Sequence, residues 1–185
     1  MKIDILFLDN DLSDHEEYFD NQTIKEYCET HSFEGEKNQI LSVPPSYSKS
    51  QNLTFLVGLG ENKVDNNFYD IGTLIGSKIK SDAEIKFLNF EEEKNLIIDG
   101  ILYVQYKFNN YKSEDDSSIN NITFKDIDSS VNEIKKDSVF WVRDLINTPA
   151  LDKSPEEFIN KVRELVDSSG IEVEVYDQKW LEEND

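Results

Sequence analysis

Residues 9–20, DNDLSDHEEYFD, form an acidic stretch whose spacing resembles a calcium-binding loop. Four of them fall on positions 1, 3, 5 and 12 of that loop: Asp9, Asp11, Ser13 and Asp20. Position 6 needs glycine for a sharp turn and holds Asp14 here, and the bidentate glutamate of position 12 is replaced by the shorter Asp20. The stretch therefore predicts a solvated acidic loop rather than a calcium site.

The other residue types that bind metals or act as nucleophiles are few. His15 and His31 are far apart and lack the His-Glu-x-x-His spacing of a zinc site. Cys28 is the single cysteine, has no activating base near it in the sequence, and is expected to pack inside a helix. No Gly-x-Ser-x-Gly motif occurs. We therefore predict no catalytic, cofactor-binding or metal-binding residue in this chain.

The stretch LVGLGEN, residues 56–62, places two glycines between an expected strand and an expected helix. Anions bind at such positions in α/β folds, because the backbone N–H groups at a helix start point outward. The stretch lacks a third glycine and the Lys-Ser/Thr pair of a phosphate loop. A tight turn without any ligand explains the glycines more simply, and an anion site stays the alternative.

Apolar runs alternate with helical stripes over the first two thirds of the chain. Strands are expected over residues 2–9, 38–45, 53–60, 84–90 and 122–127. Helices are expected over residues 22–30, 65–79 and 97–108. This order, with polar loops between the elements, predicts an α/β layered domain over residues 1–128.

Two helix starts carry clear capping signals. Ser130 and Glu133 form a capping-box pattern that opens a linker helix, and Pro149 ends it near Asn147. Ser154, Pro155 and Glu157 open a second helix, which Gly170 is placed to cap.

The sequence IEVEVY, residues 171–176, alternates strictly and predicts a strand. One helix and one strand cannot bury their apolar faces by themselves. We therefore expect a linker helix over residues 129–149 and the start of a truncated second domain over residues 150–185.

Composition limits the partners. The chain has 185 residues, with 39 acidic against 19 basic and a net charge of −20. A field of that sign repels nucleic acid and anionic lipid, so neither is an expected partner. A single cysteine, no signal peptide and no apolar run of about 20 residues predict a cytoplasmic protein.

The linker helix and the second helix are expected to meet at a hinge near Pro149. The residues around this hinge resemble a known family, the leucyl aminopeptidases (cytosol aminopeptidases, peptidase family M17). That family carries an Arg-Asp-Leu-x-Asn-x-Pro run between its domains, followed by a Thr/Ser-Pro helix start and a Gly-x-x-Val-x-Val strand. The matching residues here are Arg143, Asp144, Leu145, Asn147, Thr148, Pro149 and Ala150. Three other stretches match the family more loosely: LVGLGEN, IDGILYVQYKFNNYKSE and HSFEGEKNQIL. Leu151 and Asp99 depart from it, since the family usually has Asn and Glu there.

The resemblance implies a fold and a division of labour. It implies a macro-domain-like α/β N-terminal domain, a layered mixed sheet flanked by helices. The linker helix and the first helix and strand of a catalytic domain would follow it. The family's two-metal site and its catalytic Lys and Arg lie in that C-terminal domain, and the motifs that carry them do not occur here. The chain itself would hold no cofactor, and two divalent metals, Zn or Mn, are implied for the full-length enzyme.

The expected function follows from that division. The whole enzyme would be a hexamer that removes N-terminal amino acids from peptides, and this part would serve architecture, assembly and access to the active site. One alternative is a stand-alone macro-like module that binds an ADP-ribose-type ligand. Another is a domain that contacts DNA, which the net charge of −20 opposes.

Overall fold

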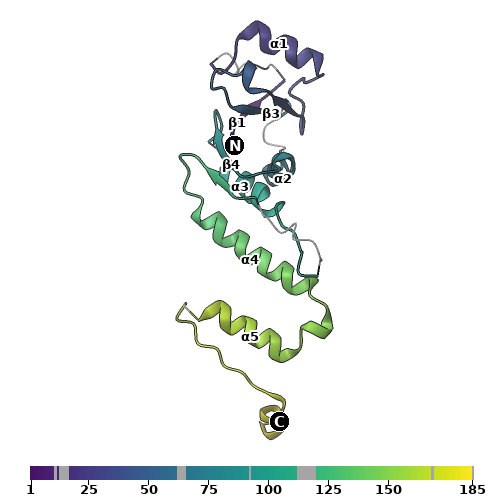
Figure 1. Cartoon of the computed structure of the whole chain (residues 1–185), viewed down its shortest axis with the longest axis vertical. Coiled ribbons are helices and arrows are strands. Elements are labelled where there is room, and N and C mark those ends of the chain that lie inside the picture. The colour runs from purple at the N-terminus through teal and green to yellow at the C-terminus, as the bar shows by residue number, and fades with distance from the viewer. Residues whose placement is uncertain are drawn as a thin grey trace. The chain divides into compact units, whose positions relative to one another are not determined.

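The computed structural model divides into two compact units, Met1–Phe140 and Trp141–Asp185. The structure describes residues 1–10, 12, 17–61, 66–91, 93–111, 120–167 and 169–184. The boundary between the units falls inside helix α4 (Ser130–Asn147), and all the strands belong to the first unit (Figure 1). Among the described helices, none combines the length and the apolar character that crossing a membrane requires.

The first unit is built on a five-stranded mixed sheet in the order β2-β3-β1-β4-β5. Strand β1 (Lys2–Leu8) is central and runs parallel to β3 (Leu53–Gly58) and β4 (Ala83–Phe87). Strand β5 (Ile122–Phe124) is parallel to β4, and β2 (Ile40–Val43) is antiparallel to β3. The sheet confirms the predicted mixed α/β class.

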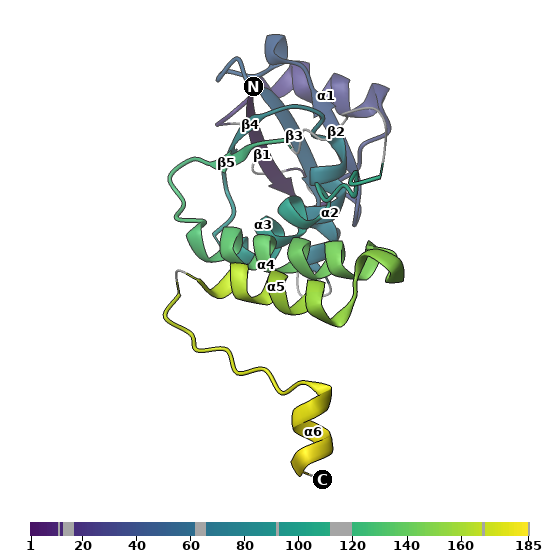
Figure 2. The ribbon, with the colours of Figure 1, turned by 60° about the horizontal axis from the view of Figure 1, so that its bottom comes forward.

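Helices cover both faces of this sheet (Figures 1 and 2). Helices α2 (Phe68–Lys78) and α3 (Lys94–Tyr103) pack on one face, and α1 (Asn21–Thr30) packs on the other. Successive side chains of a strand point to opposite faces, so β1 serves both layers. Its residues toward α2 and α3 are Ile3, Ile5 and Phe7, and those toward α1 are Leu6 and Leu8. From Ile5 to Leu8, this strand therefore has a core cluster on each side.

Helices α2 and α3 approach each other through glycine. A Cβ atom at Gly72 would lie 2.2 Å from the carbonyl oxygen of Ile97, and one at Gly100 would lie 2.2 Å from that of Tyr69. Any larger side chain at either position would push the helix backbones apart. The two glycines therefore set the separation of this helix pair and, with it, the packing of the layer on the sheet.

Two expectations about the first unit need correction. The helix expected over residues 97–108 begins at Lys94 and ends at Tyr103, after which the Gln105 N–H donates to the Leu102 carbonyl at 3.2 Å, three residues back rather than four. Phe108, expected on the helical stripe, therefore lies beyond the helix.

The cap of α4 lies one or two residues before Ser130 rather than at Ser130. The Asp128 carboxylate accepts the backbone N–H of Ser130 at 3.0 Å, and this hydrogen bond lowers the pKa of Asp128. The Ser129 hydroxyl donates to the Glu133 carboxylate at 3.1 Å. Ser130 is itself the first helical residue. The capping-box pattern therefore predicted a helix at the right place, but Ser130 is not its N-cap.

The second unit contains the end of α4, a short 3₁₀ turn at Ala150–Asp152, helix α5 (Pro155–Val166) and helix α6 (Gln178–Asn184). The Ser154 hydroxyl accepts the Glu157 N–H at 3.2 Å, which confirms the predicted start of α5. The strand expected over residues 171–176 is not formed, because no described strand pairs with it and an isolated extended segment lacks the ladder that defines a strand.

Candidate functional site

The second face of the sheet is only partly covered, and its uncovered part is charged. Helix α1 packs over β2, β3 and the end of β1. Beyond it, the register places Lys2 beside Glu84 and Asp4 beside Lys86 on adjacent strands. Alternation along each strand turns these four side chains away from the core that α2 and α3 cover. The sheet thus presents a row of ionisable groups where a second helical layer would otherwise lie.

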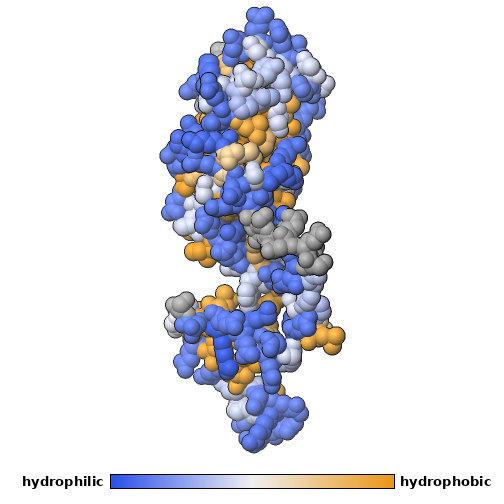
Figure 3. Space-filling model, viewed as in Figure 1, coloured by the Kyte–Doolittle hydropathy of each residue, from blue (hydrophilic) through white to orange (hydrophobic). Residues whose placement is uncertain are grey.

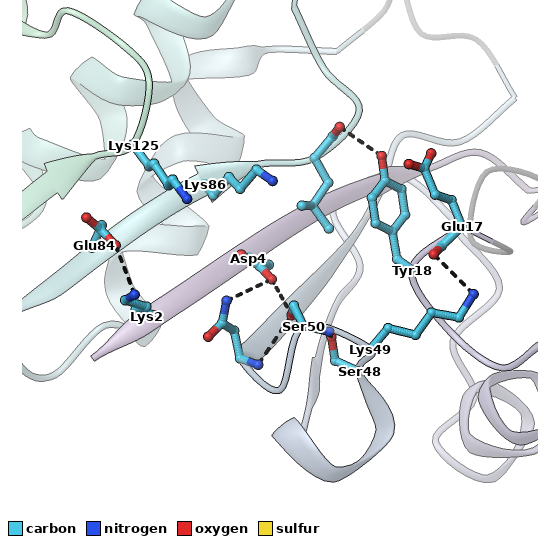
Figure 4. A pocket seen from close by; sticks show the side chains of 12 residues that line it. Lys2, Asp4, Glu17, Tyr18, Ser48, Lys49, Ser50, Glu84, Lys86 and Lys125 are labelled. Atoms are coloured by element: carbon cyan, nitrogen blue, oxygen red, sulfur yellow. Dashed lines mark hydrogen bonds and ion pairs between the residues drawn. The ribbon is translucent and has the colours of Figure 1, made fainter.

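Asp4 is the unusual member of this row, because it is only 2% exposed although it is charged. Its carboxylate accepts hydrogen bonds from the Ser50 hydroxyl at 2.5 Å and the Asn52 side-chain amide at 3.2 Å (Figure 4). The Ser50 hydroxyl also lies 2.8 Å from that of Ser48. Buried carboxylates normally accept hydrogen bonds from the protein, so these two donors explain how the fold tolerates Asp4 at a buried position.

A short loop before β3 delivers these partners. Phe19 and Ser48 form an isolated antiparallel bridge, and the Lys49 N–H donates to the Tyr18 carbonyl at 3.1 Å. Gln51 then takes a positive φ of 58° and donates its N–H to the Ser48 carbonyl at 3.1 Å. This tight turn directs Ser50 back over the first residues of β1, which lie far from it in the sequence.

The row of charges forms the floor of a cavity of about 340 Å³. Its lining residues are Lys2, Asp4, Glu17, Tyr18, Ser48, Lys49, Ser50, Asn52, Glu84, Lys86, Leu88 and Lys125. Tyr18 donates its hydroxyl to the Leu88 carbonyl at 3.0 Å and so closes one side of the cavity (Figure 4). Four lysines therefore gather at one concave site of a strongly acidic chain.

The glycine turn of residues 56–62 is explained by chain packing. A Cβ atom at Gly58 would lie 2.1 Å from the carbonyl oxygen of Glu36. The N–H of Gly60 donates to the Gly35 carbonyl at 2.9 Å, and both residues have a positive φ, 72° and 71°. The glycines thus allow two backbone segments to touch, which supports the simpler of the two interpretations.

The start of helix α2 is a poor binding site for an anion. Its N-cap residue, Asn67, accepts the Asp70 N–H through its own side chain at 3.5 Å and donates to the Asp70 carboxylate at 2.9 Å. An anion at this helix start would meet that carboxylate directly. The structure therefore does not support a phosphate cradle at the described residues of this turn.

The remaining candidates have structural roles where the structure describes them. Asp20 caps α1 by accepting the Gln22 N–H at 3.1 Å. His31 stacks on Tyr27, with ring centroids 4.1 Å apart. Cys28 is buried as predicted, and burial raises the pKa of its thiol to about 11. In the acidic stretch, the Asp9 carbonyl accepts the Leu12 N–H at 3.1 Å. The candidates Asp11, Ser13, Asp14 and His15 lie outside the described residues.

The sequence did contain a signal for Asp4. It stands in an apolar run that becomes the central strand, where a charged residue is rarely buried without partners. Ser50 and Asn52 carried no such signal, because an exposed polar loop looks the same with or without a buried partner. Within the described residues, no group of three or more His, Cys, Asp or Glu side chains could hold a metal ion.

The hinge in the second unit is held by local bonds. Thr148 donates both its N–H and its hydroxyl to the Asp144 carbonyl, at 2.9 and 2.7 Å. The Lys153 ammonium donates to the Leu145 carbonyl at 2.5 Å, which satisfies one of the last acceptors of α4. Leu151, between Thr148 and Lys153 in the sequence, is 96% exposed. The resulting turn places an open apolar surface between the end of α4 and the start of α5, lined by Val142, Leu145, Ile146, Pro155 and Phe158.

Known proteins resemble this chain over most of its length, although no family model matches it. A curated relative from Clostridium tetani, described as "Probable cytosol aminopeptidase", is 26% identical over 173 residues. The match covers 82% of this chain and 35% of the relative. The chain resembles the N-terminal domain of the leucyl aminopeptidase family. It spans about a third of the length of the curated relatives it matches.

Solved structures share the fold. A tomato leucine aminopeptidase variant superposes with a TM-score of 0.72 at 15% identity, over 98% of this chain and 43% of that one. The bottromycin maturation enzyme BotP in complex with Mn gives 0.71 at 14% identity, over 98% and 39%. The match to the leucyl aminopeptidase fold thus extends through both units of the chain.

Proposed function

We propose that this chain is the N-terminal, non-catalytic portion of a cytoplasmic, metal-dependent leucyl aminopeptidase that removes N-terminal amino acids from peptides. Residues 1–128 would form its N-terminal domain, 129–149 the linker helix and 150–185 the start of the catalytic domain. The portion would serve architecture, assembly into a hexamer and access to the active site. Support comes from relatives that carry the aminopeptidase name and extend well beyond the matched region.

The observation that carries this proposal is the exposure of apolar side chains in the second unit. Helix α5 has no buried residue among those described. Even its large apolar side chains are open to solvent, since Phe158 is 44% and Leu165 55% exposed. Figure 3 shows hydrophobic residues on the surface of this unit. Other large exposed side chains are Val142, Ile146, Leu151, Ile171, Tyr176, Trp180 and Leu181. Apolar surface of this extent is expected to be covered by further protein.

The chemistry would belong to the remainder of the enzyme. Two divalent metals, Zn or Mn, would polarise the scissile carbonyl and activate water there. One solved structure with this fold, the bottromycin maturation enzyme BotP, is a complex with Mn. In this proposal, the chain contributes no metal ligand and no catalytic residue, and it would position the domain that supplies both.

An activity assay tests this division. Purified chain, supplied with Mn²⁺ or Zn²⁺, is expected to release no leucine from leucyl amide above a metal-only blank. Release that grows with protein concentration and survives repurification would overturn the non-catalytic assignment. The reading frame beyond codon 185 tests the parent enzyme separately: a continuation that encodes a two-metal domain supports the proposal, and an immediate stop codon contradicts it.

The alternative functions have less support. The comparisons do not favour a stand-alone module for an ADP-ribose-type ligand, since the matched relatives are aminopeptidases. The glycine turn is packed against another backbone segment, and the start of α2 is capped by its own side chains. The described residues there offer no phosphate-binding site for an ADP-ribose-type ligand. A relation of the sheet to macro domains remains part of the proposed fold. Binding to nucleic acid is opposed by the net charge of −20.

A further inference from the structure

We propose that the cavity over Asp4 binds a small dianionic oxyanion, such as the phosphate group of a small molecule, between the ammonium groups of Lys86 and Lys125. The two lysines come from adjacent strand ends, since the Lys125 N–H donates to the Ile85 carbonyl at 2.7 Å. Both line the cavity of about 340 Å³ (Figure 4). The site belongs to the first unit and does not depend on the proposed aminopeptidase activity.

The charges of the cavity walls point to an anion. Three acids line the cavity: Asp4 accepts hydrogen bonds from Ser50 and Asn52, the Glu84 carboxylate lies 4.0 Å from the Lys2 ammonium, and Glu17 is the third. Within the part of the chain that the structure describes, neither Lys86 nor Lys125 forms an ion pair. The lining thus holds four lysines against three acids, a formal charge of +1, in a chain whose overall charge is −20.

That contrast argues for a built site. With 39 acidic side chains in the chain, a lysine on an ordinary surface has many chances to meet a carboxylate. Lys86 and Lys125 instead share a concave surface, and Asp4, the register partner of Lys86, accepts hydrogen bonds from Ser50 and Asn52. Two ammonium groups match a dianion in charge, and their donors match the acceptor oxygens of phosphate.

The shape of the cavity limits the ligand. Its volume lies at the lower end of the range for small-molecule sites, about 300–1,000 Å³. Tyr18 and Leu88 form an apolar wall beside the lysines, which suits a phosphate group attached to a small organic body. A polymer of phosphates is a poor match, because the negative field of the whole chain opposes it outside the cavity.

Titration of the whole chain with inorganic phosphate tests the site. Backbone and lysine NMR signals are followed at about pH 8, where phosphate is mainly dianionic, and at a constant ionic strength of about 0.1 M. We expect saturable shifts at Lys86, Lys125 and their neighbours, with acetate binding at least about fivefold more weakly because it carries a single charge. Shifts spread evenly over all surface lysines, or acetate that binds as well as phosphate, would overturn the proposal.

Matched variants separate the cavity from general surface charge. Lys86→Gln and Lys125→Gln are each expected to weaken phosphate binding by about fivefold, and the double variant is expected to abolish saturable binding. Lys80→Gln removes the same charge from an exposed residue outside the cavity and is expected to leave binding unchanged. Equal loss in Lys80→Gln and Lys86→Gln would show that only net charge matters and would contradict the site.

Discussion

The side-chain amide of Asn132 donates to the Asp99 carboxylate at 2.7 Å, and both residues are buried. The same amide donates to the Asn95 carbonyl at 3.0 Å, and Lys135 lies 3.3 Å from the other Asp99 oxygen. Asp99 lies on α3 and Asn132 on α4, so this contact ties the first turns of α4 to the layer that covers the sheet.

Asn132→Ala is therefore expected to lower the free energy of unfolding by about 1–3 kcal/mol, because it leaves a buried oxygen of the Asp99 carboxylate without its donor. Urea denaturation measures the loss. Lys135→Ala is the matched control on the same helix: its side chain is half exposed, and removing it should cost no more than about 1 kcal/mol. A larger effect at Lys135 than at Asn132 would show that charge rather than burial anchors α4.

Gly72→Ala tests the close approach of α2 and α3. Alanine normally favours a helix over glycine by about 1 kcal/mol, so an unconstrained position would gain stability. Here the new Cβ would lie 2.2 Å from the Ile97 carbonyl oxygen, and a net loss of about 1–3 kcal/mol is expected. Ser77→Ala, at an exposed position of the same helix, should change stability little. A gain in stability for Gly72→Ala would contradict the packing.

The Cys28 thiol is expected to be unreactive in the folded chain. Burial raises its pKa from 9.0 to about 11, which lowers the thiolate fraction at pH 8 by about 100-fold. Iodoacetamide should therefore label the native chain at least about 100-fold more slowly than the urea-unfolded chain, as followed by mass spectrometry. Equal labelling rates would show that α1 opens readily.

The same pKa shift predicts a pH dependence of stability. Because the folded-state pKa is raised, the contribution of Cys28 is complete below about pH 9 and is lost as the pH rises toward 11. Tyrosines titrate in the same window, so the chain is compared with Cys28→Ala. The free energy of unfolding should fall more steeply between pH 9 and 11 in the parent chain than in the variant, and parallel curves would rule out the shift.

Hydrogen exchange is expected to differ between the two units. Helix α3 is largely buried, whereas the described side chains of α5 are all at least partly exposed. Amides of α5 should exchange at least about tenfold faster than those of α3, because local opening of α5 exposes little additional apolar surface. Equal protection of the two helices would indicate that α5 is covered, for example by a second copy of the chain.

Leu151 and Ile97 provide a pair with opposite expectations. Leu151 is 96% exposed, so Leu151→Asn, which restores the residue usual in the resembled family, should change the free energy of unfolding by less than about 0.5 kcal/mol. Ile97 is fully buried, so Ile97→Asn should cost more than about 3 kcal/mol. Thermal or urea unfolding of the two variants measures the contrast, and a costly Leu151→Asn would mean that the hinge side chain is covered in solution.

The sequence by itself determined the order and type of most elements, because these depend on local patterns. The apolar run after Asp4, the stripe from Phe68 to Ile79 and the Ser154-Pro155 start each act within a few residues. Element ends were less certain, since α3 ends at Tyr103 although the apolar pattern continues to residue 108. The run of residues 143–150 at the hinge resembles the leucyl aminopeptidases by its sequence alone, because the motif is local.

Only the tertiary structure decided which of these elements meet. The cavity over Asp4 joins residues from β1, the loop before β3, β4 and the end of β5, and no local pattern links positions that far apart in the sequence. The alternation of residues 171–176 likewise could not guarantee a strand, because a strand exists only when a neighbouring strand supplies its hydrogen bonds. Local propensity sets what each segment can form, and long-range packing decides what it does form.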